Sequence, residues 1–426
     1  MQFFISEIAH KIIGNIRIAA VDEKYKKKEK LMMQSFVQYT PTKVVFGKDT
    51  QKEAGKLVSE LGITKVFLVY GGGSVIRSGL LDEIKKSLDE EHISYEELGG
   101  VKPNPRLSFA RKGVEKAIAF GAELILAVGG GSAIDTAKGI AIGAANPDTD
   151  IWEFWKNKKE LKKALPVGTV LTISAAGSEM SNSAVLTDEE TQDKSGIGSD
   201  LIRPKFAIMN PKLTYTLPKY QLTCGIVDIF MHTIERYFTP VHGNELTDEI
   251  AEGLMRTLIR NAAKAYENQE DYDAMSEIMW CGSISHNGIT GLGRPKDFLC
   301  HKLGHQLGAK FDEAHGATLS AVWGSWARYV YHLDEARFAN YGRKVWNIDE
   351  ENDEKTAVAA IEKTEEFFRS LHMPTCLGDM KMGVQPDEVL KEMAGKATAG
   401  DTMKVGAFQK MGAKELYEIY KKANHR

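Results

Sequence analysis

Two stretches of the sequence carry metal-capable side chains at helical spacing. In VDIFMHTIE, Asp228 and His232 stand four residues apart. In DFLCHKLGHQLGAKFDEAH, His301 and His305 stand four apart and His315 follows ten residues later. Residues at positions i and i+4 share one helix face, so each stretch can aim two groups at one point. One carboxylate with imidazoles from two helices suits a divalent first-row metal.

A glycine-rich stretch offers a second kind of chemistry. The apolar run ELILAV leads directly into GGGSAIDTAK, residues 129–138. A strand, three glycines, a serine and a helix start are typical of a phosphate cradle, because glycines let the backbone approach an anion that faces the helix N–H groups. The spacing matches neither G-x-G-x-x-G nor the P-loop. A tight turn without a ligand is the alternative, but such a turn rarely needs three successive glycines.

An earlier glycine run, Gly71, Gly72, Gly73 and Ser74, ends another apolar stretch. In dinucleotide-binding folds this place meets the adenosine ribose, where an acidic residue favours NAD. The run has no carboxylate, and Arg77 follows three residues later. It therefore favours NADP, with NAD as the alternative.

Composition narrows the class of protein. Of 426 residues, 43% are hydrophobic and 27% charged, and the net charge is −3, which gives no electrostatic argument for nucleic acid or a membrane surface. No apolar run approaches the roughly 20 residues of a membrane helix. Four cysteines without a C-x-x-C indicate a reducing, cytoplasmic location.

Helix and strand patterns alternate in the first half of the chain, which predicts a parallel sheet covered by helices on both faces. After Pro218 only helical patterns follow. We therefore predict an N-terminal extension (1–33), an α/β dinucleotide-binding domain (34–214) and an all-helical metal and substrate domain (215–426). The extended stretch 36–46 reads as an exposed edge, which suggests pairing with a second copy in a homodimer.

Taken together, these motifs resemble the iron-dependent (group III) alcohol dehydrogenases, and most closely the butanol dehydrogenases and broad-range aldehyde reductases. YGGGSVIRSGLL, KPNPRL, TISAAGSEMSNSAV, YTLPKYQLTCGIVDIFMHTIERY and RPKDFLCHKLGHQLGAKFDEAHGATL carry the likeness, which runs from about Ser35 to the C-terminus. The extension before it departs from the family pattern. The resemblance implies an architecture like that of dehydroquinate synthase, with an α/β nucleotide domain and an all-α metal domain.

The resemblance also implies roles for individual residues. Metal binding falls to four side chains: Asp228, His232, His301 and His315. The catalytic positions beside the nicotinamide are His305, which is not a ligand, and Asp135. The cofactor-binding positions are Gly71, Gly72, Gly73, Ser74, Asn104, Gly130, Gly131, Ser132, Asp135, Lys138, Thr172, Ser178, Ser181 and Lys194.

The predicted function is metal-dependent hydride transfer between NAD(P)(H) and a short-chain primary alcohol or aldehyde, butanol or butanal by resemblance. A divalent ion would polarise the alcohol or aldehyde oxygen. We hypothesise that His305, one turn from His301, relays the proton to solvent or ribose hydroxyls. The family name implies Fe²⁺, and Zn²⁺ or Mn²⁺ stay open because ligand type does not decide among them.

Two other classes of function remain open at this point. A non-redox metal lyase of the dehydroquinate synthase type would need a basic patch for a phosphorylated, carboxylated substrate, and the helical half has no Lys/Arg cluster beside its histidines. A metal-storing module would need no nucleotide loop.

Overall fold

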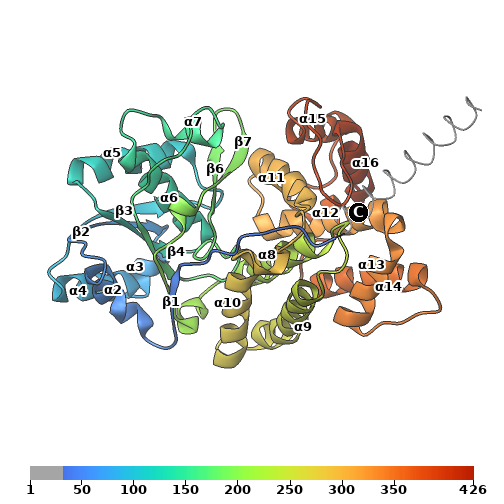
Figure 1. The fold of residues 1–426 in the computed structure, drawn as a ribbon, viewed down its shortest axis with the longest axis horizontal. Coiled ribbons are helices and arrows are strands. Elements are labelled where there is room, and N and C mark those ends of the chain that lie inside the picture. The colour runs from blue at the N-terminus through green and yellow to red at the C-terminus, as the bar shows by residue number, and fades with distance from the viewer. Residues whose placement is uncertain (1–31) are drawn as a thin grey trace, which may run out of the picture.

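A six-stranded parallel sheet forms the centre of the N-terminal half (Figure 1). The structure is a computed structural model and describes residues 32–426; the predicted extension, apart from its last two residues, lies outside this range. Neighbouring strands follow the order β1-β8-β5-β4-β2-β3, and every pair is parallel. The strands are β1 (Lys43–Phe46), β2 (Lys65–Gly71), β3 (Ser94–Val101), β4 (Leu124–Gly129), β5 (Val167–Leu171) and β8 (Phe206–Met209).

Apolar side chains cover both faces of this sheet, as a parallel sheet requires. Alternate residues of β2 belong to different cores: Val66 and Leu68 pack with one set of helices, Phe67 and Val69 with another. The helices on the first face are α2 (Ala54–Ser59), α3 (Ser74–Arg77) and α4 (Leu80–Glu90), and those on the second are α5 (Leu107–Phe120) and α6 (Gly131–Ala145). The predicted α/β class is confirmed.

Three details differ from a simple alternation of strands and helices around one sheet. Strands β6 (Ser183–Asp188) and β7 (Asp193–Gly198) form a separate antiparallel hairpin. The second strand, DKSGIG, has no apolar run that would predict it. Helices α3 and α4 are separated at Gly79, which adopts a φ of 77°. Of the stretch 36–46, only β1 pairs in the sheet.

Helices make up the C-terminal half, again as predicted. They surround one large core in which Trp323 and Trp326 are fully buried and the rings of Phe238 and Phe338 stack at 4.1 Å. The helices are α8 (Lys219–Tyr237), α9 (Glu245–Glu267), α10 (Tyr272–His286), α11 (Leu299–Phe311), α12 (His315–Val330), α13 (Glu335–Tyr341), α14 (Asp353–Ser370), α15 (Asp387–Ala397) and α16 (Ala413–Ala423).

The two halves lie side by side, with α8, α10 and α11 nearest the sheet domain (Figure 1). Helix α11 contacts β7, and α10 contacts the turn that follows β8. Within residues 32–426 no helix is both long and apolar enough to cross a membrane. All four cysteines fall in this range and are free thiols.

Candidate metal and nucleotide site

Four side chains from three helices converge on one point at the inner side of the helical half. Asp228 and His232 project from α8, His301 from α11, and His315 is the first residue of α12. Ligand atoms of Asp228, His232 and His301 all lie within 4.8 Å of one another. Asp228 Oδ1 lies 3.8 Å from His301 Nε2 and 3.7 Å from His315 Nε2. The structure thus brings together the four residues proposed as metal ligands.

Packing explains how polar groups come to lie in the core. Helix α8 is buried along almost its whole length, and its apolar residues fill the main core around Asp228 and His232, each 4% exposed. Helix α12 approaches α8 closely at Gly316, where a Cβ atom would lie 2.1 Å from the Cys224 carbonyl oxygen. No larger residue fits there, so this glycine fixes how near His315 comes to Asp228.

The donor set fits a divalent ion. Asp228 Oδ1 and His301 Nε2 are buried and have no hydrogen-bond partner among the described residues, a costly arrangement unless something else binds them. His301 Nδ1 bonds Glu235, which leaves its Nε2 to face Asp228 Oδ1, as outer hydrogen bonds do in metal sites. His232 Nδ1 lies 2.9 Å from the Asp228 carbonyl oxygen and 3.1 Å from Asp228 Oδ1.

Burial and neighbouring charge act differently on the histidines. Burial lowers the pKa of His232 and of His315 below the ordinary value, which favours the neutral imidazole that binds metals. Burial opposes charge on His301 too, but the carboxylates of Glu235 and Asp228 outweigh it and raise the pKa of His301 to about 9. A metal entering this cluster must therefore displace a proton from His301.

Glu235 is the residue that sequence reasoning missed. It is fully buried, and its Oε1 accepts hydrogen bonds from the backbone N–H groups of Cys300 at 2.6 Å and His301 at 3.3 Å. Its Oε2 accepts from His301 Nδ1. Glu235 therefore orients His301 and satisfies the start of α11. A signal was available, because Glu235 follows Asp228 by seven residues, two helical turns on the same face.

His305 lies beside the cluster and outside it. Its ring centroid is 5.3 Å from that of His315 and 6.3 Å from that of His301. Burial, with the nearby charge of Lys194, holds the pKa of His305 well below its usual value. His305 is thus a neutral imidazole on the side of the cluster that faces the sheet domain.

The two glycine runs lie next to each other at the carboxyl edge of the sheet. Strands β2 and β4 pair with Tyr70 opposite Val128, so each run follows its strand at the same level. Ligands of open α/β sheets bind at such edges. A Cβ on Gly130 would lie 1.9 Å from Ile173, whereas a Cβ on Gly131 would make only ordinary contact and one on Gly72 would meet nothing. Packing requires Gly130, whereas no described atom crowds the positions of a Cβ on Gly131 or Gly72.

The loop 174–182 lines this edge, and Lys138 holds it in place. The Lys138 ammonium is fully buried and donates to the carbonyl oxygens of Ser178, Ser181 and Ser183 at 2.7–3.0 Å. It also reaches the hydroxyls of Ser178 and Ser181. This corrects the expectation for Lys138, whose side chain supports the loop and has no surface left for a cofactor. Ser181, 1% exposed, is turned into the same network.

Asp135 is also bonded within the protein. Its Oδ1 accepts from Ser178 Oγ at 2.5 Å and its Oδ2 from the Val185 N–H at 2.9 Å. It keeps part of its surface exposed, as do Ser132 and Thr172. The Thr172 N–H donates to the Gly129 carbonyl oxygen at 3.1 Å, which joins the ends of β5 and β4.

Asn104 and Lys194 lie where the sheet domain meets α11. Lys194 donates to Asn104 Oδ1 at 2.9 Å, and Asn104 donates to Asp312 Oδ1 at 2.9 Å. A Cβ on Gly308 would lie 3.6 Å from both Asn104 Oδ1 and Lys194 Nζ. Burial lowers the pKa of Lys194 to about 8. The His301–His305 helix therefore meets the nucleotide half at a polar interface.

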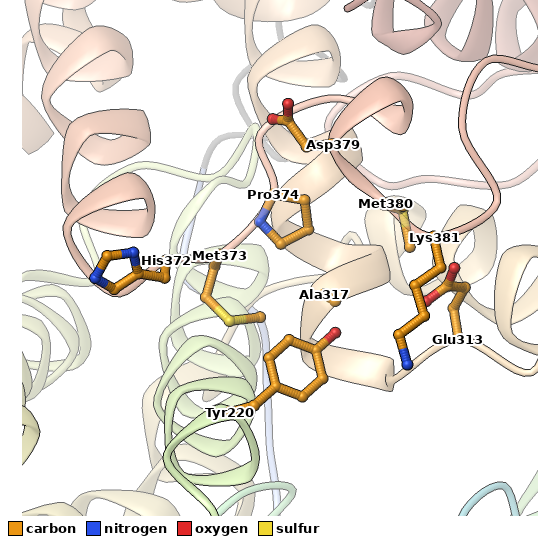
Figure 2. A pocket seen from close by; sticks show the side chains of 9 residues that line it. All are labelled: Tyr220, Glu313, Ala317, His372, Met373, Pro374, Asp379, Met380 and Lys381. Atoms are coloured by element: carbon orange, nitrogen blue, oxygen red, sulfur yellow. The ribbon is translucent and has the colours of Figure 1, made fainter.

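A cavity of about 510 Å³ lies elsewhere, between the starts of α8 and α12 and the loop 372–381 (Figure 2). Its lining includes Tyr220 and Ala317 but none of the four clustered residues. Tyr220 lies two helical turns before Asp228 on α8. The cavity thus lies further along α8 from the cluster. It is separate from the polar interface between α11 and the sheet domain.

Comparison with known proteins identifies the family. Residues 41–211 match the family model described as iron-containing alcohol dehydrogenase, and residues 223–424 match the C-terminal model of the Fe-containing alcohol dehydrogenase family. Both models are of dehydrogenases and give no support to the lyase alternative.

Individual relatives cover nearly the whole chain. NADH-dependent butanol dehydrogenase A of Clostridium acetobutylicum is 39% identical over 92% of this chain and 100% of its own length. The NADPH-dependent aldehyde reductase YqhD of Escherichia coli is 37% identical over 82% of this chain and 89% of its own. The crystal structure of NADH-dependent butanol dehydrogenase A from Thermotoga maritima superposes with a TM-score of 0.89 at 35% identity, over 92% of this chain and 100% of that one. The chain therefore belongs to the iron-containing alcohol dehydrogenase family and is an oxidoreductase of that family.

Proposed function

We propose that this enzyme interconverts short-chain primary alcohols and aldehydes of the butanol and butanal class. Hydride is carried by NADP(H), with NAD(H) as the alternative, and a divalent metal is required: Fe²⁺ first, Zn²⁺ or Mn²⁺ as the other candidates. The convergence of Asp228, His232, His301 and His315 beside the glycine-lined sheet edge carries the proposal. One relative is named as an NADH-dependent butanol dehydrogenase and another as an NADPH-dependent aldehyde reductase, in line with this assignment.

Each group at this interface has a task in the proposed scheme. Asp228 and the three histidines would hold a divalent ion, which would supply a Lewis acid for the alcohol or aldehyde oxygen. Glu235 keeps His301 in the ligating orientation. His305, a neutral imidazole outside the ligand cluster, accepts the alcohol proton at one ring nitrogen and releases a proton from the other. Replacing His305 by Gln and finding an unchanged pH–rate profile would remove that role.

One aromatic side chain beside the cluster would help to protect hydride. We place the nicotinamide near Asp135, Ser178 and Lys194. The Phe298 ring lies on the helical side of the cluster, with its centroid 5.0 Å from that of His301. An apolar ring excludes water from that side, which strengthens electrostatic interactions with the reacting oxygen.

The preference for NADP(H) rests on the first glycine run. No carboxylate is present from Gly71 to Ser74, and Arg77 Nη1 lies 3.3 Å from the place that a Cβ on Gly73 would take. The guanidinium thus folds back over the loop, where a 2′-phosphate would lie. Arg77→Glu should raise the KM for NADPH by at least tenfold, as expected for a lost charge-assisted pair, and leave the KM for NADH nearly unchanged.

One assay tests the reaction as a whole. The metal-reconstituted protein is mixed with butanal and either NADPH or NADH, and absorbance of the reduced cofactor is followed. Net oxidation of the cofactor that depends on both butanal and metal supports the proposal. A lyase would use its nucleotide only transiently and show no net oxidation, and a metal-storing protein would show no nucleotide-induced fluorescence change.

We also propose a homodimer in the cytoplasm, with residues 34–214 binding nucleotide and 215–426 binding metal and substrate. Large apolar side chains are exposed on the extended segment before β1: Met32, Met33, Phe36, Val37 and Tyr39, the valine at 90%. Within the described residues β1 pairs only with β8, so its outer edge is open. Val37→Asp should shift the molar mass seen by light scattering towards the monomer.

A further inference from the structure

His286, the last residue of α10, bonds both halves of the molecule. Its Nδ1 lies 2.8 Å from Nη2 of Arg236 on α8, and its Nε2 lies 3.0 Å from Ser183 Oγ at the start of β6. A guanidinium can only donate, so His286 Nδ1 is the acceptor. The ring proton must then be on Nε2, which donates to Ser183. The hydrogen bonds themselves fix the tautomer.

At its helical end this bridge reaches a proposed metal ligand. Arg236 Nη1 donates to the carbonyl oxygen of His232, and the ring centroids of His286 and His232 are 4.3 Å apart. Arg236 is 3% exposed, and its guanidinium lies over the Phe298 ring at 4.7 Å. His286 thus braces the turn of α8 that carries His232, through Arg236 and by direct ring contact.

At its other end the bridge reaches the loop beside the glycine run. The Ser183 carbonyl oxygen accepts from Lys138, which also holds Ser178 and Ser181. At Gly177, with a φ of 63°, a Cβ would lie 2.8 Å from His286 Cβ. The loop 174–182 is therefore held by Lys138 on one side and packed against His286 on the other.

We propose that His286 is a positioning residue that sets the spacing between the metal-ligand helix and the nucleotide-binding loop. It is not a fifth ligand, because both ring nitrogens are engaged and coordination would leave Nη2 of the buried Arg236 without its acceptor. The inference rests on the metal and nucleotide sites proposed above and adds the residue that joins them. His286 lies outside the metal-capable spacings in the sequence, and only the fold shows that its two hydrogen bonds connect the domains.

Three variants separate positioning from mere support. His286→Leu removes both bonds, and His286→Gln can keep an acceptor and a donor. Ser183→Ala cuts the link to the sheet domain and also removes the 3.2 Å contact of its hydroxyl with Ser181 Oγ. Ser195→Ala on β7 is the control, since the Ser195 hydroxyl bonds Asp193 and, within the described residues, no group of the helical half. The full-length protein is tested for Co²⁺ affinity by chelator competition, for its Co²⁺ absorption spectrum, and for the Kd of NADPH by fluorescence.

His286→Leu should weaken Co²⁺ binding by about tenfold, the lower range for a group that supports a ligand, and alter the visible Co²⁺ spectrum. Ser183→Ala should leave Co²⁺ affinity within about twofold while raising the NADPH Kd about fivefold, the effect of one neutral hydrogen bond. The double variant should match His286→Leu in NADPH Kd, because both changes cut the same link. His286→Gln should restore both affinities.

Two results would contradict the proposed role of His286. One is that the effects of His286→Leu and Ser183→Ala on the NADPH Kd add up in the double variant. The other is that Ser183→Ala has the same NADPH Kd as the control Ser195→Ala. Ser183→Ala keeps the test decisive if His286→Leu fails to fold. Failure of the underlying sites looks different. In that case the unmodified protein would bind no NADPH, or it would show no Co²⁺ binding that is lost in Asp228→Asn. Either result would also contradict the proposed role of His286.

Discussion

The metal cluster and the nucleotide edge are built in opposite ways. In the cluster, side chains would do the binding, and the backbone of α8, α11 and α12 only carries them. At the sheet edge, backbone groups of Gly129 to Gly131 would do the binding, and side chains such as Lys138 only hold the loops in shape. The first kind of site fails when a functional group is removed. The second fails when a side chain is added.

The strongest test of this contrast removes a ligand. Asp228→Asn keeps the shape of the side chain but takes the only carboxylate from the four proposed ligands. Metal retention should be lost, and butanal reduction should fall by roughly a thousandfold, the scale of losing the main electrostatic stabiliser of a reacting oxygen. Metal analysis and steady-state kinetics measure this. NADPH affinity should change little, because the sheet edge does not use Asp228.

Asp150→Asn is a matched control, since it makes the same chemical change on a carboxylate that bonds Arg111 and the Trp152 N–H in the sheet domain. Full activity in Asp228→Asn with normal metal content would remove Asp228 from the ligand set.

A smaller loss of metal affinity is expected when Glu235, which bonds the proposed ligand His301, is replaced. Glu235→Gln loses the charge that supports His301, and Glu235→Leu also leaves two N–H groups of α11 without an acceptor. Metal affinity should fall by about tenfold in the first variant and towards a hundredfold in the second, the range known for groups that orient metal ligands. Chelator competition gives both values, and equal affinities in all three proteins would show that Glu235 supports the fold alone.

How far the sequence predicts these two regions follows from the same contrast. Spacing along a helix fixes which side chains share a face, so the pairs Asp228/His232 and His301/His305 could be predicted as metal-capable. The resemblance, and not the spacing, selected His301 over His305 as a ligand. Glu235 satisfies the same spacing, but a buried carboxylate that serves a histidine looks, in sequence, like one more helical glutamate. The partner group on α11 is what gives it a role, and that contact is tertiary.

The sheet edge was harder to predict in detail. The glycine runs predicted a ligand-binding edge. The apolar stretches before them were correctly predicted as strands, because apolar runs between helices are a strong pattern. The role of Lys138 could not be predicted, because a lysine next to a glycine loop suggests phosphate contact, and only the fold shows its ammonium turned inward to three carbonyl oxygens. The hairpin β6–β7 was missed in part because β7 alternates polar residues and glycine.

Proton release on metal binding sharpens the comparison, because the two regions respond to rising pH in opposite ways: at the nucleotide side Lys194, whose pKa is lowered to about 8, loses its positive charge. The pKa of His301 is raised to about 9, so at lower pH a metal must displace its proton. Apparent Co²⁺ affinity should therefore rise about tenfold per pH unit between pH 7 and 8 and level off near 9, after correction for metal hydrolysis. In Glu235→Gln the pKa falls, and the slope should flatten. NADPH affinity over the same range should not follow this slope.

The smallest expected effect tests the nucleotide edge by adding one methyl group. Gly131→Ala meets only ordinary contact with Ala176 and Gly72→Ala meets nothing, so both proteins should fold with melting temperatures close to that of the unmodified enzyme. If phosphate groups approach the backbone there, each methyl occupies ligand space, and the Kd of NADPH should rise about tenfold in each, with metal affinity unchanged. Gly130→Ala is the contrasting variant: its methyl would lie 1.9 Å from Ile173 and should destabilise the protein itself. Unchanged NADPH binding in Gly131→Ala would mean that the nucleotide does not use this turn, and that the three glycines serve the strand-to-helix connection alone.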